Sequence, residues 1–342
     1  MTDSPIFDKK QTNIAKGVAV LLLLWHHLFY NSSEYYERFK SLYLLSSGEP
    51  IECVLSDFYK VCVSIFLVLS GFGLYKSWCA YARRLSVVKL SLLNQMIFVK
   101  NHLLKLMFSY WFVYLIFVPI GIFFGSSFWD VYQRNILFGI LDFLGLFYLF
   151  STPSMNPTWW FMSIIIVYYL IFPVFVKIII YSAKLWLFIC VVICAAYFLP
   201  DLKLNSWMLP FSLGMILSKY YFFEKVALRN QSKTKRFFLS CVAVLALFMV
   251  RFLLLKHVVI DTVFAVTIIL LCFFFNSCCQ CFFGEIGIIQ WRNLYVSYVY
   301  IQLLFSRFYL WVQIPTGYFF YTDCNMLFDC DRDRAYQEIE TL

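Results

Sequence analysis

Three side chains near the N-terminus have the types and spacing for acid–base and anion-binding chemistry. Lys16 and His27 lie eleven residues apart within one apolar run, residues 14–30. On an α-helix this separation is about 20° past three full turns, so the two side chains share one face, about 16.5 Å apart along the axis. His26 falls about 80° from that face. An imidazole can take a proton from a hydroxyl group while a lysine holds an anion lower on the same helix.

An alternative interpretation explains the same residues by their position in a membrane alone. Both histidines could lie at a membrane interface, and Lys16 could extend its side chain to lipid headgroups. The composition requires a membrane in either case. Of the 342 residues, 62% are hydrophobic and 14% are charged, against about 45–50% and about 25% in average soluble domains. We therefore predict an all-α, polytopic integral membrane protein, and exclude a disordered chain, a collagen-like chain and an ordinary soluble domain.

The formal net charge of +9 raises the question of a nucleic-acid partner. The cations lie between apolar runs, which the positive-inside rule explains better than nucleic-acid binding does. We expect the lipid bilayer as a partner and no nucleic acid.

Nine apolar runs approach the length needed to cross a bilayer, about 20 residues with a range of roughly 17–25. They are residues 14–30, 55–74, 106–124, 160–176, 185–199, 206–222, 237–255, 258–275 and 294–312. A tenth run, residues 136–150, contains Asp142. Whether this run crosses the membrane determines the predicted topology.

Two basic segments indicate whether that tenth run crosses the membrane. Residues 76–105 hold six Lys or Arg and no acid, and residues 219–236 hold six with one Glu. Both should be cytoplasmic, together with the N-terminus, and this holds only if residues 136–150 do not cross. We predict one external excursion over residues 130–159, in a protein of nine to ten spans. We expect Asp142 to be a solvated residue of this excursion, with a contact to an acceptor as the alternative.

Residues 1–312 form one predicted membrane-embedded domain, because no internal repeat or Pro/Gly-rich linker divides them. Residues 313–342 form a polar, acidic C-terminal tail. The 12 cysteines lie mostly in apolar runs and fit no standard zinc spacing, so we expect neither disulfides nor a metal site. Arg251 and Asp261 flank a tight hairpin at equal depth, which favours an ion pair.

Three further segments accompany the Lys16–His27 pair along the chain. Gly71 and Gly73 near the end of the second run permit close approach of another helix. His102 and Lys105 lie one turn apart, where the third run leaves the cytoplasm. Residues 156–163 open the fourth run with two adjacent tryptophans.

In this order the segments closely resemble acyltransferase family 3, the bacterial integral-membrane O-acyltransferases. That family opens with Arg or Lys, ten residues and then His, as at Lys16 and His27. A Phe-rich Leu-Ser-Gly-Phe stretch ends its second span, as at residues 66–72, and a Trp-Phe-Leu-like start marks a later span, as at residues 160–162. The resemblance covers roughly residues 9–280.

The resemblance implies a multi-pass enzyme of the bacterial cytoplasmic membrane. Such enzymes move an acyl group, usually acetyl, from cytoplasmic acyl-CoA to a sugar hydroxyl of lipopolysaccharide O-antigen, capsule, exopolysaccharide or another envelope or lipid-linked glycan. His27 would be the catalytic histidine, and Lys16 would contact the donor. Acetyl-CoA would be a substrate rather than a bound cofactor. Lys16, His102 and Lys105 would supply cations for its phosphates.

Trp159 and Trp160 could stack on a sugar of the acceptor. The alternative for both is the belt of aromatic residues that marks a membrane interface.

Two departures from the family pattern leave other functions open. His102 and Lys105 stand where the family has an Arg-x-x-Arg pair, and they cannot reproduce its bidentate phosphate contacts. No histidine follows His257, although the family usually has a late Tyr-Leu-x-His-like span. Against the family pattern, an altered or truncated C-terminal tail over residues 313–342 is one interpretation of this departure. A catalytically degenerate family member is therefore one alternative. A polysaccharide or small-molecule transporter is another, although transporters more often show internal repeats.

Overall fold

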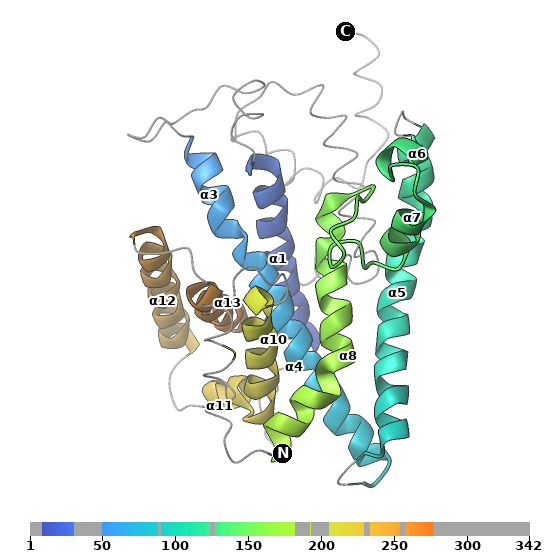
Figure 1. The fold of residues 1–342 in the computed structure, drawn as a ribbon. Coiled ribbons are helices and arrows are strands. Elements are labelled where there is room, and N and C mark those ends of the chain that lie inside the picture. Colours follow the sequence, from blue (N-terminus) through green and yellow to red (C-terminus); the bar gives the residue numbers. More distant parts are fainter. Residues whose placement is uncertain are drawn as a thin grey trace, which may run out of the picture. The chain divides into compact units, whose positions relative to one another are not determined.

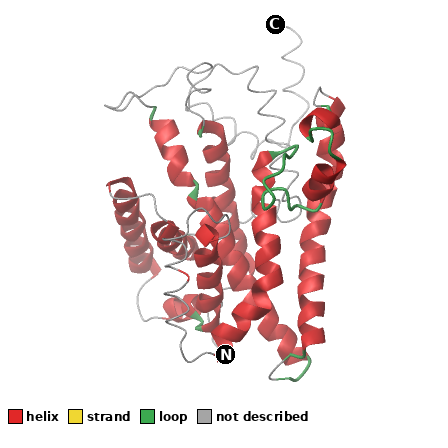
Figure 2. Ribbon diagram, viewed as in Figure 1, coloured by secondary structure: helices red, strands yellow, loops and turns green. Residues whose placement is uncertain are grey.

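The computed structural model describes residues 9–30, 50–87, 90–123, 127–181, 192, 205–228, 233–253 and 258–275. Within these ranges the chain forms helices joined by turns and has no strand element (Figure 2). The predicted all-α class is therefore confirmed for the described residues. The chain separates into unit 1, Met1–Leu24 with Lys60–Ile301, and unit 2, Trp25–Tyr59 with Gln302–Leu342.

Helix α1 begins in unit 1 and ends in unit 2, α3 belongs to unit 2, and the remaining described helices belong to unit 1 (Figure 1). The elements are α1 (Lys9–Phe29), α3 (Ile51–Tyr59), α4 (Val61–Arg84), α5 (Leu92–Phe123), α6 (Phe128–Val131), α7 (Ile136–Phe143), the 3₁₀ helix η1 (Pro157–Trp159), α8 (Trp160–Tyr181), α10 (Asn205–Lys219), α11 (Phe222–Leu228), α12 (Lys233–Leu253) and α13 (Val258–Phe273).

Four helical stretches are long and apolar enough to cross a bilayer. They are Lys10–Phe29, Ile51–Arg84, Leu92–Phe123 and Pro157–Ile179, and each covers one of the first four predicted runs to within one residue. The later helices α10, α12 and α13 match the predicted runs at 206–222, 237–255 and 258–275 to within a few residues. The runs at 185–199 (apart from Val192) and 294–312 lie outside the described residues, so the total of nine to ten spans and the cytoplasmic N-terminus stay predictions.

The long helix α5 has one face buried in the protein and another face of exposed apolar side chains that suits contact with lipid. Tyr110 and Tyr114, one turn apart, are buried, whereas Phe108, Phe112 and Leu115 on other faces are 65%, 57% and 63% exposed. Water would penalise these exposed apolar side chains, but lipid tails are as apolar as they are. The exposed face of α5 therefore fits a bilayer and not an aqueous surface.

Local sequence explains where α8 begins. The side chain of Asn156 accepts a hydrogen bond from the backbone N–H of Thr158 at 3.0 Å, and Pro157 occupies the first position of η1. An Asn cap followed by Pro is a common helix start, because the cap satisfies an unpaired N–H and Pro has none to satisfy. These residues place Trp159 and Trp160 at the beginning of the helix.

Two glycines bring α4 and α10 into backbone contact. A Cβ atom built on Gly71 of α4 would lie 2.0 Å from the carbonyl oxygen of Phe211 in α10. A Cβ built on Gly214 of α10 would lie 2.1 Å from the carbonyl oxygen of Val68 in α4. No side chain fits at either position, so glycine is what allows the two backbones to meet. The predicted close approach is therefore confirmed at Gly71, but a Cβ on Gly73 would meet nothing within 4 Å, so Gly73 is not part of the contact.

The contact is reciprocal, because each glycine meets the carbonyl three residues before the other glycine. Such symmetry belongs to helices that run in the same direction, and Figure 1 shows α4 and α10 parallel. Two further contacts involve the C-terminal halves of α4 and α10. Lys76 Nζ lies 3.5 Å from Glu224 Oε1, and Lys219 donates a hydrogen bond to the carbonyl of Ile179 at the end of α8. The two basic segments therefore lie at the same end of unit 1, as their predicted location on one side of the membrane requires.

We expect Gly71→Ala and Gly214→Ala to destabilise the protein, because each added methyl group would collide with a backbone carbonyl of the facing helix. Overpacking of this kind costs about 1–3 kcal/mol. The measurement is the midpoint of thermal unfolding of the detergent-solubilised protein. Gly73→Ala on the same helix is the matched control, and its midpoint should stay at the wild-type value. Equal midpoints for all three variants would contradict the proposed contact.

Candidate active site

Helix α1 carries the three residues singled out from the sequence. It is continuous from Lys9 to Phe29, so Lys16 and His27 belong to one helix, as predicted. Lys16 is half-buried in unit 1. In unit 2, His27 is exposed, whereas the adjacent His26 is only 8% exposed. Of the two imidazoles, His27 is therefore the one that a substrate can reach.

Two side-chain hydrogen bonds hold the end of α1 on α3 within unit 2. His26 Nδ1 lies 2.8 Å from the carbonyl oxygen of Ser56, and Trp25 Nε1 donates to the carbonyl oxygen of Glu52 at 3.4 Å. The ring of Trp25 also meets the ring of Tyr59 edge to face, with 5.6 Å between centroids. The two accepting carbonyls are four residues apart, one turn of α3. The sequence alone indicates no partner for Trp25 or His26, because their acceptors are backbone atoms 27 and 30 residues away.

His102 and Lys105 lie on α5, one turn apart as predicted. His102 Nδ1 is 2.9 Å from the carbonyl oxygen of Phe98, and its ring packs on the ring of Phe98 at 4.1 Å. A carbonyl can only accept, so Nδ1 carries the hydrogen. The other nitrogen, Nε2, is then the acceptor of the neutral ring, so it can donate to a phosphate only when the ring is protonated. Lys105 is exposed.

The excursion over residues 130–159 is organised around the carboxylate of Asp142. Tyr132 Oη donates to Oδ2 at 2.6 Å, Ser154 Oγ to Oδ1 at 2.8 Å, and the backbone N–H of Met155 to Oδ2 at 3.0 Å. Asp142 has no exposed surface. The expectation of a solvated residue is therefore wrong. Burial raises the pKa of the Asp142 carboxyl, and the three donors act in the opposite direction.

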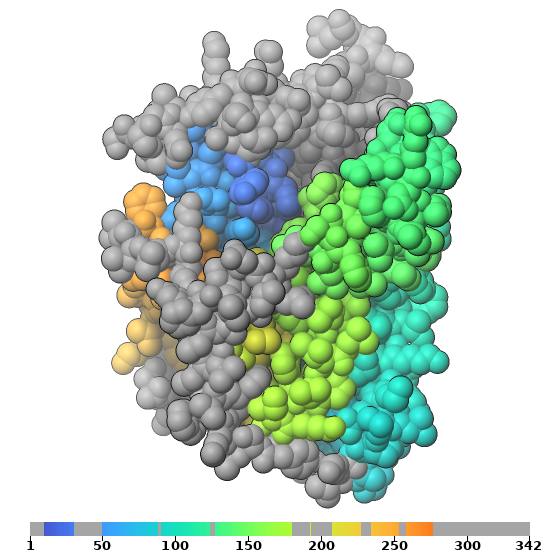
Figure 3. Space-filling model, in the orientation of Figure 1, coloured from blue at the N-terminus to red at the C-terminus, as the bar shows by residue number. Residues whose placement is uncertain are grey.

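The excursion is fastened to the two helices that flank it. Tyr110 Oη of α5 donates to the carbonyl of Asp142 at 2.6 Å, and Trp111 Nε1 donates to the carbonyl of Phe143 at 3.0 Å. Ser163 of α8 donates to the carbonyl of Gly145, whose φ of +69° suits glycine. Figure 3 shows the excursion (green) directly against α5 (teal) and α8 (lime).

These contacts and the length of α7 fit the prediction that the tenth apolar run does not cross the membrane. Helix α7 has only eight residues, which is about 12 Å of helix against a hydrocarbon core of about 30 Å. The side chains of α5 and α8 supply the hydrogen-bond partners that exposed backbone would lack in lipid. The predicted excursion agrees with the structure in this respect.

The two adjacent tryptophans have different surroundings. Trp159 is 3% exposed, and its ring packs on Tyr110 and Tyr114 with centroids 5.5 and 5.7 Å away. Trp160 is half-buried, and its ring lies 5.4 Å from that of Trp207 on α10 and 5.7 Å from that of Tyr148. Sugar stacking stays a prediction for both, but only Trp160 presents a partly open ring.

Trp207 and Tyr148 were not found from the sequence. Trp207 lies 47 positions from Trp160 and Tyr148 lies 12 positions from it, and no helical or strand spacing connects them. Only the packing of α10 and the excursion on α8 brings the three rings together.

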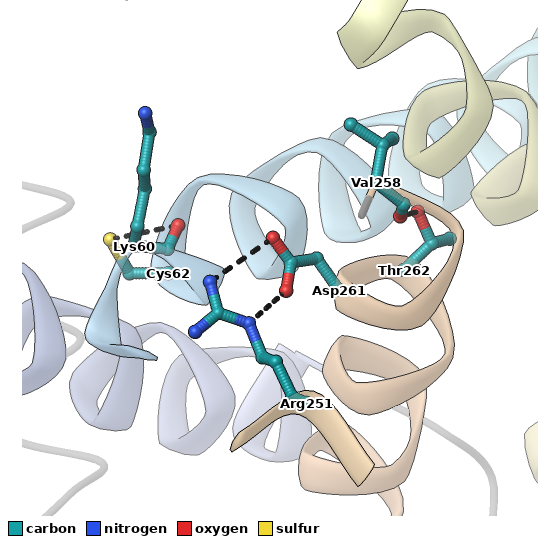
Figure 4. Close-up of polar contacts among 6 residues, drawn as sticks. All are labelled: Lys60, Cys62, Arg251, Val258, Asp261 and Thr262. Carbon is teal, nitrogen blue, oxygen red and sulfur yellow. Dashed lines mark hydrogen bonds and ion pairs between the residues drawn. The ribbon is translucent and has the colours of Figure 1, made fainter. Parts of the chain in front are cut away.

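Arg251 and Asp261 form the ion pair that their depth predicted. Arg251 Nε and Nη2 both donate to the carboxylate of Asp261, the second at 3.4 Å, and Arg251 is 4% exposed (Figure 4). The pair joins α12 to α13, and Figure 4 shows it beside Lys60 and Cys62 at the start of α4. A buried charge within a membrane helix needs such a partner. Among the residues that the structure describes, no group of three His, Cys, Asp or Glu side chains is arranged to hold a metal.

We expect Asp142→Ala to loosen the excursion, because it removes the acceptor of three donors, of which Tyr132 is buried and Ser154 and Met155 are partly buried. Each donor left unsatisfied costs about 1–3 kcal/mol. Limited proteolysis should cut within residues 127–159 at lower protease concentration than in the wild type. Asp130→Ala, which removes an exposed carboxylate from the same excursion, is the matched control and should keep the wild-type pattern. Protection that is equal in both variants would show that Asp142 does not organise the excursion.

Comparison with known proteins agrees with the resemblance seen in the motifs. The sequence profile of the Acyltransferase domain family matches residues 10–324, nearly the whole chain. The match continues past residue 280, where the motif-based resemblance ends. Searches of curated proteins and of solved structures found no match. With its apolar helices and this match, the chain belongs to the Acyltransferase domain family and is a membrane acyltransferase.

Proposed function

We propose that this protein moves an acyl group, acetyl in the first instance, from cytoplasmic acyl-CoA to a sugar hydroxyl of a cell-envelope polysaccharide. The acceptor would be O-antigen, capsule, exopolysaccharide or a lipid-linked glycan, and the location the bacterial cytoplasmic membrane. One observation carries the proposal: in a chain of this acyltransferase family, His27 is exposed near the C-terminal end of α1, the helix that also carries Lys16 in its N-terminal half.

In the proposed reaction His27 acts as the general base. Its imidazole takes the proton of the sugar hydroxyl while the hydroxyl oxygen attacks the thioester carbon of acetyl-CoA. A new C–O ester bond forms, and the C–S bond to coenzyme A breaks. The departing thiolate receives the proton that the imidazole took, so the enzyme returns to its starting state. Transfer through an acylated His27 is the alternative route to the same products.

Lys16, His102 and Lys105 are the proposed contacts for the phosphates of the donor. Lys16 and Lys105 offer N–H groups to an anion, and His102 does so through Nε2 when its ring is protonated; charge-assisted hydrogen bonds of this kind are stronger than neutral ones. Without the family's arginine pair these contacts are single rather than forked. The transporter alternative has no observation in its favour, and an inactive family member is the alternative that the assay below separates.

We expect His27→Ala to reduce acetyl transfer by at least about 100-fold, the contribution typical of a general base. Membranes containing the protein are supplied with acetyl-CoA labelled in the acetyl group, and label is followed into envelope polysaccharide from a strain without native O-acetylation. His257→Ala is the matched control and should transfer at the wild-type rate. A fully active His27→Ala variant would refute the assignment of His27, and a wild type without transfer would favour an inactive family member.

We expect Lys16→Ala to raise the apparent KM for acetyl-CoA about tenfold, since one hydrogen bond to a charged group is lost. The apparent KM for the acceptor should change by less than twofold. Lys100→Ala is the control and should leave the apparent KM for acetyl-CoA and for the acceptor unchanged. Lys100 is a lysine outside the proposed donor contacts, about 140° around α5 from Lys105. An unaltered KM for acetyl-CoA in Lys16→Ala would exclude the donor contact.

A further inference from the structure

Unit 2 holds a second imidazole directly beside His27, and its surroundings differ sharply from those of His27. The centroids of the His26 and His27 rings are 5.1 Å apart, with 60° between the ring planes. Tyr30 lies on His26 as well, with 4.8 Å between centroids. His26 is buried and His27 is exposed. With such different surroundings, the adjacent residues His26 and His27 cannot have the same role.

The hydrogen bond of His26 determines which of its nitrogens carries the proton. The Nδ1 atom lies 2.8 Å from the carbonyl oxygen of Ser56. A carbonyl oxygen only accepts, so Nδ1 must be the protonated nitrogen of the neutral ring. The plane of the imidazole is thereby fixed relative to the backbone of α3.

A second bond prevents this end of α1 from turning on α3. Trp25 Nε1 donates to the carbonyl oxygen of Glu52, one turn before Ser56. Because Trp25 and His26 are consecutive, rotation of α1 about its axis would break both bonds together. The residue that follows them, His27, is then presented in one direction.

We propose that His26 is a positioning residue for acyl transfer: its bond to the Ser56 carbonyl holds His27 in the orientation in which it meets the acceptor hydroxyl. This inference rests on the proposed function of His27 and extends it to a residue that does not touch the substrate. Reactions that depend on orientation lose about 100-fold in rate for a misplacement of about 1 Å. Loss of His26 should therefore lower kcat and leave the apparent KM for acetyl-CoA unchanged.

The test compares His26→Asn with His26→Leu in membranes, with rates normalised to the amount of folded protein. The two replacements have nearly the same shape, but only Asn offers an N–H near the position of Nδ1. We expect His26→Leu to lower kcat roughly 10- to 100-fold with KM for acetyl-CoA within twofold of wild type. His26→Asn should recover most of that loss.

The controls separate failure of this inference from failure of the proposed function. If wild-type membranes show no transfer that depends on His27, the proposed function fails and this inference fails with it. If they do show it, equal kcat in Leu, Asn and wild type would overturn the positioning role alone. Equal losses in Leu and Asn, or a change mainly in KM, would also overturn it. A loss of folded protein in Leu with an unchanged normalised kcat would show a merely structural role.

Discussion

The contact between Gly71 and Gly214 is the constraint on which the arrangement of unit 1 depends. It brings two parallel helices together at their backbones, with each glycine against a carbonyl of the other helix. In lipid no hydrophobic effect holds helices together, so close packing at small residues supplies much of the attraction. Helices α8 and α13 then pack on this pair. Because α4 and α10 run in the same direction, their charged ends come together, and the basic segments share one side.

A second constraint is that polar groups within a membrane must find partners inside the protein. Asp142 has three donors, and Arg251 has the carboxylate of Asp261. These contacts explain two features of the architecture. The excursion can lie against α5 and α8 without crossing, and α12 can carry an arginine into its last turn. In both places the polar group joins elements that apolar packing alone would leave free to slide.

The candidate active site combines these principles on a smaller scale. His27 is the reactive candidate because it is exposed, and His26 is its fixed neighbour because α3 provides a backbone acceptor. The same contrast occurs at the start of α8, where Trp159 is buried in the packing on α5 while Trp160 stays half-buried beside Trp207. In each pair, adjacent residues of one type differ in exposure because of what another helix places next to them.

The sequence by itself determined the all-α membrane class, the approximate positions of the seven predicted runs that the structure describes, the Arg251–Asp261 pair and the helical register of Lys16 and His27. These follow from composition, run length and the helical repeat, which act over a few residues. Only the tertiary structure decided that Gly71 and not Gly73 meets α10, that Asp142 is buried, and that His26 bonds to Ser56. The reason is physical: these outcomes depend on which faces of separate elements meet in the folded chain, between residues as far apart as Gly71 and Gly214, 143 positions from each other. No periodicity in the chain records which faces of two helices will meet.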